Sequence, residues 1–187
     1  PPTPKRFYLP WPKQCATGYV SYLQKRGISV SVIQRCYRLG MLYESVYKQK
    51  EPDGKVKYLP VCVFLGKDES GKTRFACMRG IHSNFRKDAY GSDKEYSFCY
   101  PPQRAGSRQL AVFEAPIDAL SHATLQEIEG WKWDGYRLSL GGTSPVALTA
   151  FLNRHPEIRR VNLYMDNDFA GLKNASAIRT AIRRDPR

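Results

Sequence analysis

The feature that most constrains the fold is a regular alternation of short apolar runs and longer amphipathic stretches over residues 109–187. Apolar runs occur at QLAVFE, YRLSLGG and RRVNLYMDND, and each is followed by a stretch whose apolar residues have helical spacing. Strands that alternate with helices are typical of a parallel sheet covered by helices, where ligands bind at the carboxyl ends of the strands. The sequence therefore predicts an α/β domain with βαβαβα order in this part.

The preceding part of the chain has a different pattern. Residues 1–13 contain five prolines, which predicts an extended arm. A helix is predicted to stop at Gly27, and Ser29 to cap a second helix that ends at Gly40. Three strand-like runs with turn signals between them follow, at MLYESVY, KYLPVCVFLG and TRFACMRG. Because residues 82–108 are polar and rich in turn formers, we predict a proline-rich arm over 1–13, a small basic α+β subdomain over 14–105 and the α/β domain over 106–187.

Positive charge is concentrated ahead of the α/β domain. Residues 1–108 carry 20 Lys and Arg against 8 Asp and Glu, whereas residues 109–187 carry 10 against 9. This imbalance favours a polyanionic partner, nucleic acid before an acidic membrane, although a solvated lysine-rich face is the simpler alternative. The 12 tyrosines and 8 phenylalanines favour single strands slightly, because bases stack on aromatic rings. No apolar run approaches the roughly 18 residues of a membrane span, so we expect no membrane partner.

The cysteines indicate the redox compartment of the protein, and the first residue indicates how the chain was produced. Five cysteines, at positions 15, 36, 62, 77 and 99, lack the CxxC spacing of a zinc site, and an odd number suits a disulfide framework poorly. We expect buried thiols in a reducing cytoplasm and no zinc in this fragment. The chain begins at Pro1 without an initiator methionine, and we therefore interpret it as a piece of a longer or processed protein.

Four acidic residues occur at strand ends or just beyond them. Glu114 ends the first predicted strand and Asp118 lies one helical turn later, while Asp166 and Asp168 form a DxD at the end of the third. Two carboxylates about 4 Å apart repel by ~4 kcal/mol at an effective dielectric constant of ~20, so a cluster of them needs a cation. Mg²⁺ takes such oxygen ligands and bridges to phosphates. The pattern predicts a Mg²⁺ or Mn²⁺ site, although any one acid alone is more often a helix cap or a solvated turn residue.

Two neighbouring features fit a phosphate near these acids. Gly141 and Gly142 allow close backbone approach in the turn after the second strand, where Ser144 can cap the next helix; a tight turn without a ligand is an equal alternative. Lys173 opens the last predicted helix and brings an ammonium group. A calcium loop at DNDFAG is excluded, because the fifth and twelfth positions, where ligands are required, are Ala170 and Ala177.

These motifs resemble a known family. VFEAPIDAL, the LGGTS turn and YMDNDFAGLKNA look like the Toprim domain of bacterial primases, type IA and type II topoisomerases and certain nucleases. The preceding part is similar in order to the basic N-terminal subdomain of the bacterial primase catalytic core. The chain also resembles primase-like Toprim proteins of conjugative and other mobile elements, over roughly residues 16–180. The resemblance implies a Toprim-type α/β fold behind a small α+β subdomain.

The resemblance also implies roles for single residues. Glu114, Asp118, Asp166 and Asp168 would hold the metal, with Glu114, Asp166 and Asp168 as the catalytic acids. Nucleotide or nucleic acid would be bound by a set of turn and basic residues, which are Arg79, Lys94, Gly141, Gly142, Thr143 and Lys173. Two of these depart from the primase pattern, because MRG reverses the family's GR and Glu95 is inserted in its KY.

The implied function is a primase-like nucleotidyl transferase core in the bacterial cytoplasm. Its partners would be single-stranded DNA or a DNA/RNA hybrid, ribonucleoside triphosphates, and a helicase or another protein of replication or transfer. Primase Toprim domains continue to a further strand and acidic motif, whereas this chain ends at Arg187, so we expect a truncated domain that lacks full activity. Phosphodiester cleavage by a nuclease or topoisomerase, and non-catalytic binding of single strands, stay open as alternatives.

Overall fold

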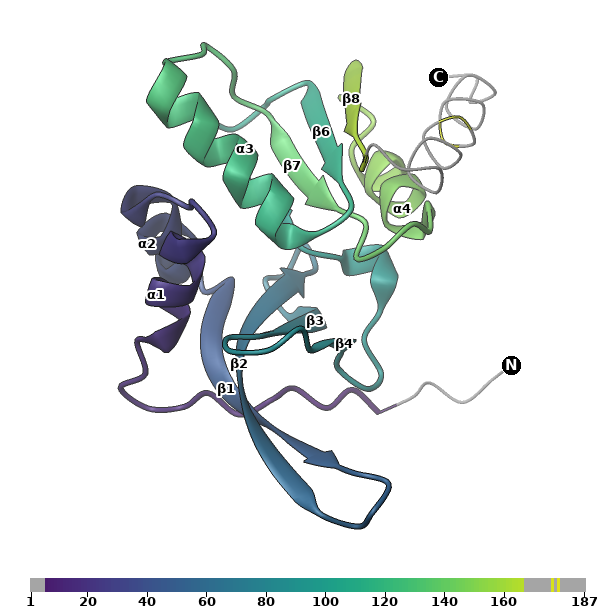
Figure 1. Cartoon of the computed structure of the whole chain (residues 1–187). Coiled ribbons are helices and arrows are strands. Elements are labelled where there is room, and N and C mark those ends of the chain that lie inside the picture. Colours follow the sequence, from purple (N-terminus) through teal and green to yellow (C-terminus); the bar gives the residue numbers. More distant parts are fainter. Residues whose placement is uncertain (1–5, 167–175, 177, 179–187) are drawn as a thin grey trace, which may run out of the picture. The chain divides into compact units, whose positions relative to one another are not determined.

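The computed structural model describes residues 6–166 together with Ser176 and Ile178 (Figure 1). The chain divides into two compact units, residues 1–93 and 94–187. This division lies ahead of the position near residue 105 that the sequence suggested. The reason is that residues 99–100 form a strand that pairs with residues 137–138 of the second unit.

The first unit combines a helical hairpin with a four-stranded antiparallel sheet of order β1-β2-β3-β4 (Figure 1). Its elements are α1 (Gly18–Lys25), α2 (Val30–Arg38), β1 (Leu42–Lys50), β2 (Val56–Lys67), β3 (Thr73–Gly80) and β4 (Arg86–Asp88). The two helices and the first three strands confirm the predictions. The short β4 was not predicted, because its three residues are polar and lie in a stretch rich in turn formers.

The signals that delimit the helices act as the sequence predicted. The Ser29 side chain accepts a hydrogen bond from the backbone amide of Val32 at 3.4 Å, and so caps α2. Gly27 and Gly40 follow the two helices with φ values of 81° and 61°. A left-handed residue at this position is the usual way to end a helix, and glycine adopts it without steric cost.

The sheet of the first unit has a packed base and a two-stranded extension. Its core on one face consists of Val61, Val63, Leu65, Ala76 and Met78. Strand β2 pairs with β3 only from Val61 onward, whereas it pairs with β1 from Val56 to Phe64. Residues 46–50 and 56–60 therefore form a two-stranded arm that extends beyond β3 (Figure 1).

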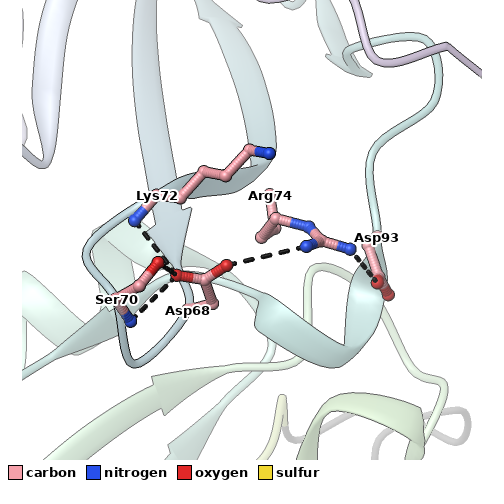
Figure 2. A network of polar contacts seen from close by, with 5 residues as sticks. All are labelled: Asp68, Ser70, Lys72, Arg74 and Asp93. Atoms are coloured by element: carbon pink, nitrogen blue, oxygen red, sulfur yellow. Dashed lines mark hydrogen bonds and ion pairs between the residues drawn. The ribbon is translucent and has the colours of Figure 1, made fainter.

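The turn between β2 and β3 is held by the polar network in Figure 2. The Asp68 carboxylate accepts hydrogen bonds from the backbone amides of Ser70 and Lys72, both at 3.0 Å, and lies 3.6 Å from the Arg74 guanidinium. Hydrogen bonding by Ser70 holds the pKa of Asp68 below its usual value. Arg74 also lies 3.9 Å from Asp93, so the predicted turn KDESGK is tied to the end of this unit.

The second unit is an α/β structure whose mixed sheet has the order β5-β7-β6-β8. Strand β6 is parallel to both neighbours, and β5 is antiparallel to β7. The elements are η1 (Lys94–Tyr96), β5 (Cys99–Tyr100), β6 (Gln109–Phe113), α3 (Pro116–Glu129), β7 (Tyr136–Ser139), α4 (Val146–Arg154) and β8 (Arg160–Tyr164). The predicted α/β class and the strand–helix order up to β8 are confirmed. Of the last predicted helix, the structure describes Ser176 and Ile178, and both are helical.

The core of the second unit lies between the sheet and α4. It consists of Leu110 and Val112 from β6, Leu138 and Leu140 in and after β7, and Ala147, Leu148 and Phe151 from α4, together with Ile178. Because successive side chains of a strand point to opposite faces, Phe113 and Arg137 belong to the other face, where both interact with His122 of α3. The helices α3 and α4 therefore cover opposite faces of the sheet.

The expected burial of the cysteine thiols can be compared with the structure. The thiols of Cys36, Cys62 and Cys77 are buried as predicted, but Cys15 is exposed, because it lies in the irregular segment ahead of α1.

Across the part of the chain that the structure describes, every helix is too short or too polar to span a lipid bilayer.

Candidate metal and nucleotide site

The site begins at the carboxyl end of β6. This strand lies between β7 and β8, so the chain leaves it toward one neighbour and later returns to the other side. Such a reversal of strand order opens a crevice at the carboxyl ends of parallel strands, and ligands bind there in open α/β sheets. Glu114 is the first residue after β6 and so lies at this point.

The structure places two of the predicted acids next to each other. The backbone amide of Asp166 donates a hydrogen bond to Glu114 Oε1 at 3.2 Å, across 52 positions of sequence. Glu114 is half-buried and Asp166 is exposed, so this pair lies at the protein surface, at the carboxyl ends of β6 and β8. Asp168 and Lys173, which the sequence analysis added to the site, lie outside the described residues.

Asp118 has a structural contact of its own. Its Oδ2 atom accepts a hydrogen bond from the backbone amide of Ala115 at 3.0 Å, at the start of α3. Helix capping is the usual role of a single acid at such a position, as an alternative to metal binding. A carboxylate near the amino end of a helix is also favoured by the helix dipole. One oxygen of Asp118 is therefore engaged in holding the helix end.

The donors present are suited to a hard cation. Carboxylate oxygens are the ligands that Mg²⁺ and Mn²⁺ prefer, and Glu114 and Asp166 carry such oxygens at adjacent strand ends. Within residues 6–166, no three His, Cys, Asp or Glu side chains come close enough together to bind an ion by themselves. The predicted site of four acids therefore stays a prediction, and it includes Asp168.

The glycine turn after β7 is tied to the backbone of Glu114. The Gly142 amide donates to the Glu114 carbonyl at 3.1 Å. The buried Ser139 hydroxyl donates to the same carbonyl at 3.3 Å and accepts from the Gly141 amide at 3.1 Å. Gly141 and Gly142 have φ values of 64° and 133°, a region that side chains with a Cβ rarely adopt. The turn thus lies beside the predicted acids and requires its glycines.

Lys94 joins this turn from a distant part of the sequence. Its ammonium group donates to the Gly141 carbonyl at 3.0 Å, across 47 positions. The predicted residues Lys94, Gly141 and Gly142 are therefore brought together, and Thr143 follows them as an exposed residue. The next helix begins differently from the prediction. Pro145, not Ser144, is the N-cap residue of α4.

Arg79 belongs to the first unit. It lies on β3, directly opposite Cys62 on β2 and Arg86 on β4. Its guanidinium donates to the carbonyl of Met78 at 3.5 Å. Arg79 and Arg86 face each other across neighbouring strands, which places two positive charges on one face of the sheet.

A buried polar pair beside the sheet was not predicted. Arg137 of β7 is only 4% exposed, and its Nε donates to His122 Nδ1 at 3.1 Å. The guanidinium also lies 4.6 Å from the Trp133 ring centroid, a cation–π contact. Burial, and then the charge of Arg137, lower the pKa of His122 to about 4, which keeps the ring neutral and able to accept this bond. The arginine within the apolar run YRLSL was the signal in the sequence.

Two family models match parts of the chain. Residues 111–185 match the family model described as Toprim-like. This part of the chain is a Toprim-like domain. Residues 21–104, ahead of the Toprim-like domain, match a different family model, described as a protein of unknown function (DUF3991). A comparison with curated proteins gives no match.

Solved primase structures share the fold of the DUF3991 region and the Toprim-like domain. The primase fragment of the bacteriophage T7 primase-helicase has a TM-score of 0.57 at 19% identity, and the match covers 91% of this chain and 66% of that one. The E. coli primase catalytic core has a TM-score of 0.55 at 19% identity, with 89% and 60% covered. A DnaG primase catalytic domain bound to single-stranded DNA has a TM-score of 0.56 at 19% identity, with 89% and 61% covered. The chain thus spans less than two thirds of each of these structures and shares the fold of bacterial and phage primase cores.

Proposed function

We propose that the chain is a primase-like nucleotidyl transferase core that acts on a single-stranded DNA template with Mg²⁺ or Mn²⁺. One observation carries the proposal: the Glu114 carboxylate lies against Asp166 at the switch point of the sheet, beside a glycine turn that Lys94 also contacts. Acids for a cation, and an ammonium group beside an open glycine turn for phosphates, are the two parts that phosphoryl transfer needs.

The residues have distinct tasks in this proposal. Glu114, Asp166 and Asp168 would hold the first cation, and Asp118 would help to place a second. A bound divalent cation would lower the pKa of a ribonucleotide 3′-hydroxyl and neutralise charge on the triphosphate. Glu114 would also be able to take up the proton of that hydroxyl, as a general base.

The turn and the basic residues would bind phosphates. The amides of Gly141 and Gly142 bond to Ser139 and Glu114 within the turn, but neither glycine carries a Cβ that would obstruct a phosphate, and Thr143 would present its backbone amide to it. Lys94 would contact the same phosphates, and Lys173 would add charge from the following segment. Arg79 would contact the nucleotide or the template from the first unit.

The first unit would bind the template through its positive charge. Lys48 and Lys50 are exposed on the two-stranded arm, and they point to the same face because they are two residues apart on β1. Lys55 and Lys57 are instead held by Asp53 at 2.9 Å and by Glu51 at 2.8 Å. The similar primase domain solved with single-stranded DNA supports this kind of partner.

The wider setting of the proposal follows from the same resemblance. Substrates would be ribonucleoside triphosphates, and the template would be single-stranded DNA that becomes a DNA/RNA hybrid. A helicase or another protein of replication or transfer would be the protein partner. Primer synthesis would take place in the bacterial cytoplasm, during replication or transfer of a mobile element.

Template-dependent incorporation of labelled ribonucleotides tests this function. The full-length protein should extend RNA on single-stranded DNA with Mg²⁺ or Mn²⁺, and Glu114→Gln should lower the rate by at least about 100-fold, as loss of a catalytic acid or base does. Equal incorporation by the variant would remove Glu114 from the site. Nicking of plasmid DNA without nucleotides would instead indicate the cleavage reaction of a nuclease or topoisomerase. DNA binding that ignores both Mg²⁺ and the substitution would indicate a non-catalytic binding module.

A further inference from the structure

A groove lies beside the glycine turn, between η1 and α4. Its volume is about 480 Å³, within the range of roughly 300–1,000 Å³ that small-molecule sites have in proteins. Tyr96 lines it from η1, and Val146, Thr149, Asn153 and Arg154 line it from α4. More of the lining is apolar than polar, and the polar groups stand at a few positions, as is usual for a ligand site.

The groove offers a flat surface and polar edges. The Arg154 guanidinium lies 4.5 Å from the centroid of the Tyr96 ring and donates to the Glu95 carbonyl at 2.7 Å. The guanidinium and the tyrosine ring are two planar groups in contact, and a planar ligand can stack on such groups. Thr149 and Asn153 are exposed on the same helix, at i and i+4, so both point to one side. A hydroxyl and a carboxamide can donate to and accept from the edge of a planar ligand.

The groove lies close to the glycine turn along the chain. Tyr96 is two residues after Lys94, whose ammonium group contacts the Gly141 carbonyl. Val146 is four residues after Gly142, at the first position of α4. The segments that flank the turn thus also line the groove.

We propose that this groove binds the base and sugar of the nucleotide whose phosphates lie at the glycine turn. The base stacks on the Tyr96 and Arg154 pair, and Asn153 and Thr149 contact its edge or the ribose. The proposal rests on the proposed function, because that function places phosphates at the turn. In addition to that function, the groove proposal assigns the choice of nucleotide to these groove residues.

Binding of two nucleotides and of a polyphosphate without a nucleoside separates the groove from the phosphate site. Affinities of Mg²⁺-ATP, Mg²⁺-UTP and Mg²⁺-tripolyphosphate would be measured by titration calorimetry. Tyr96→Ala should weaken both nucleotides by about tenfold, the size of one stacking contact, and leave tripolyphosphate unchanged. Tyr96→Phe keeps the ring and should bind as the original chain does. Asn153→Ala should change the ratio of the ATP and UTP affinities, which general damage to the fold would not do. Tyr90→Ala, an exposed tyrosine of the first unit, is the matched control.

The outcomes distinguish the two proposals. If Tyr96→Ala and Asn153→Ala bind both nucleotides as the original chain does, the groove proposal is overturned, and the phosphate site is judged separately by Glu114→Gln. If the original chain binds tripolyphosphate as tightly as it binds ATP and UTP, no nucleoside contact exists and the groove proposal is again overturned. If Tyr96→Ala weakens only a single-stranded oligonucleotide, the groove receives a template base, and its assignment to the free nucleotide is overturned.

Discussion

Two acids four residues apart illustrate how the site is built at the scale of single residues. Glu114 directs its carboxylate to the backbone of the neighbouring strand end, next to Asp166, whereas Asp118 caps α3 through the Ala115 amide. The spacing is compatible with one shared site, but the contacts of the two side chains differ. Substitutions that keep the hydrogen bond and remove the charge can therefore separate capping from metal binding.

Asp118 allows that separation. Asp118→Asn keeps an oxygen that can accept the Ala115 hydrogen bond, so its free energy of unfolding should stay within about 0.5 kcal/mol of the original, while Asp118→Ala should lose about 1 kcal/mol. Both variants remove a negative charge, and both should weaken Mn²⁺ binding. Urea unfolding and Mn²⁺ titration provide the two measurements. Unchanged Mn²⁺ affinity in Asp118→Asn would show that this residue only caps the helix.

His122 predicts a pH dependence of stability. In the folded chain its pKa is lowered to about 4, by burial first and then by the charge of Arg137. In the unfolded chain it should have its ordinary pKa of about 6.5. Between these pH values the unfolded state binds more protons, so the stability that the neutral ring contributes is present above pH ~6.5 and is lost as pH falls toward about 4.

Unfolding by urea at several pH values tests this. The free energy of unfolding should decline less steeply from pH 6.5 to 4 in His122→Gln than in the original chain. His82→Gln removes an exposed imidazole outside the buried pair and is the matched control. An identical slope in His122→Gln would contradict the lowered pKa.

At the scale of elements, the arm formed by residues 46–50 and 56–60 gives the clearest prediction. If Lys48 and Lys50 contact phosphates, each should release counterions on binding, and replacing both with Gln should reduce the slope of log K against log salt by about 1.4. Lys55→Gln with Lys57→Gln removes the same charge from residues that already pair with Asp53 and Glu51, so the slope should change less. The measurement is fluorescence anisotropy with labelled single-stranded DNA at salt concentrations from roughly 50 to 300 mM. Equal slopes for the two double variants would show that Lys48 and Lys50 of the arm do not bind the template.

The turn between β7 and α4 shows why some contacts escaped prediction at this scale. The glycines of LGGTS predicted a tight turn beside the acids, and the structure confirms that position. The tie between Lys94 and Gly141 depends on η1, a single turn within the polar stretch 82–108. Such short elements carry too few residues to give a periodic pattern, so β4, η1 and β5 were all missed.

At the scale of the whole molecule, local pattern determined most of what could be predicted. Alternating apolar runs identified the α/β part, and glycine and serine signals placed the helix ends at Gly27, Ser29 and Gly40, because these depend on neighbours in sequence. The buried pair of Arg137 and His122, and the groove of Tyr96 and Arg154, depend on contacts between distant segments. Those contacts form only in the folded chain, and no local spacing of residues in the sequence indicates them.

Binding of Mn²⁺, followed by electron paramagnetic resonance, tests the central claim most directly. The original chain should bind Mn²⁺, and Glu114→Gln should weaken that binding at least about tenfold, since a ligand oxygen and its charge are lost. Glu129→Gln removes the same charge at the far end of α3 and should bind Mn²⁺ as the original chain does. Equal Mn²⁺ affinity in the original chain and in Glu114→Gln would contradict the account.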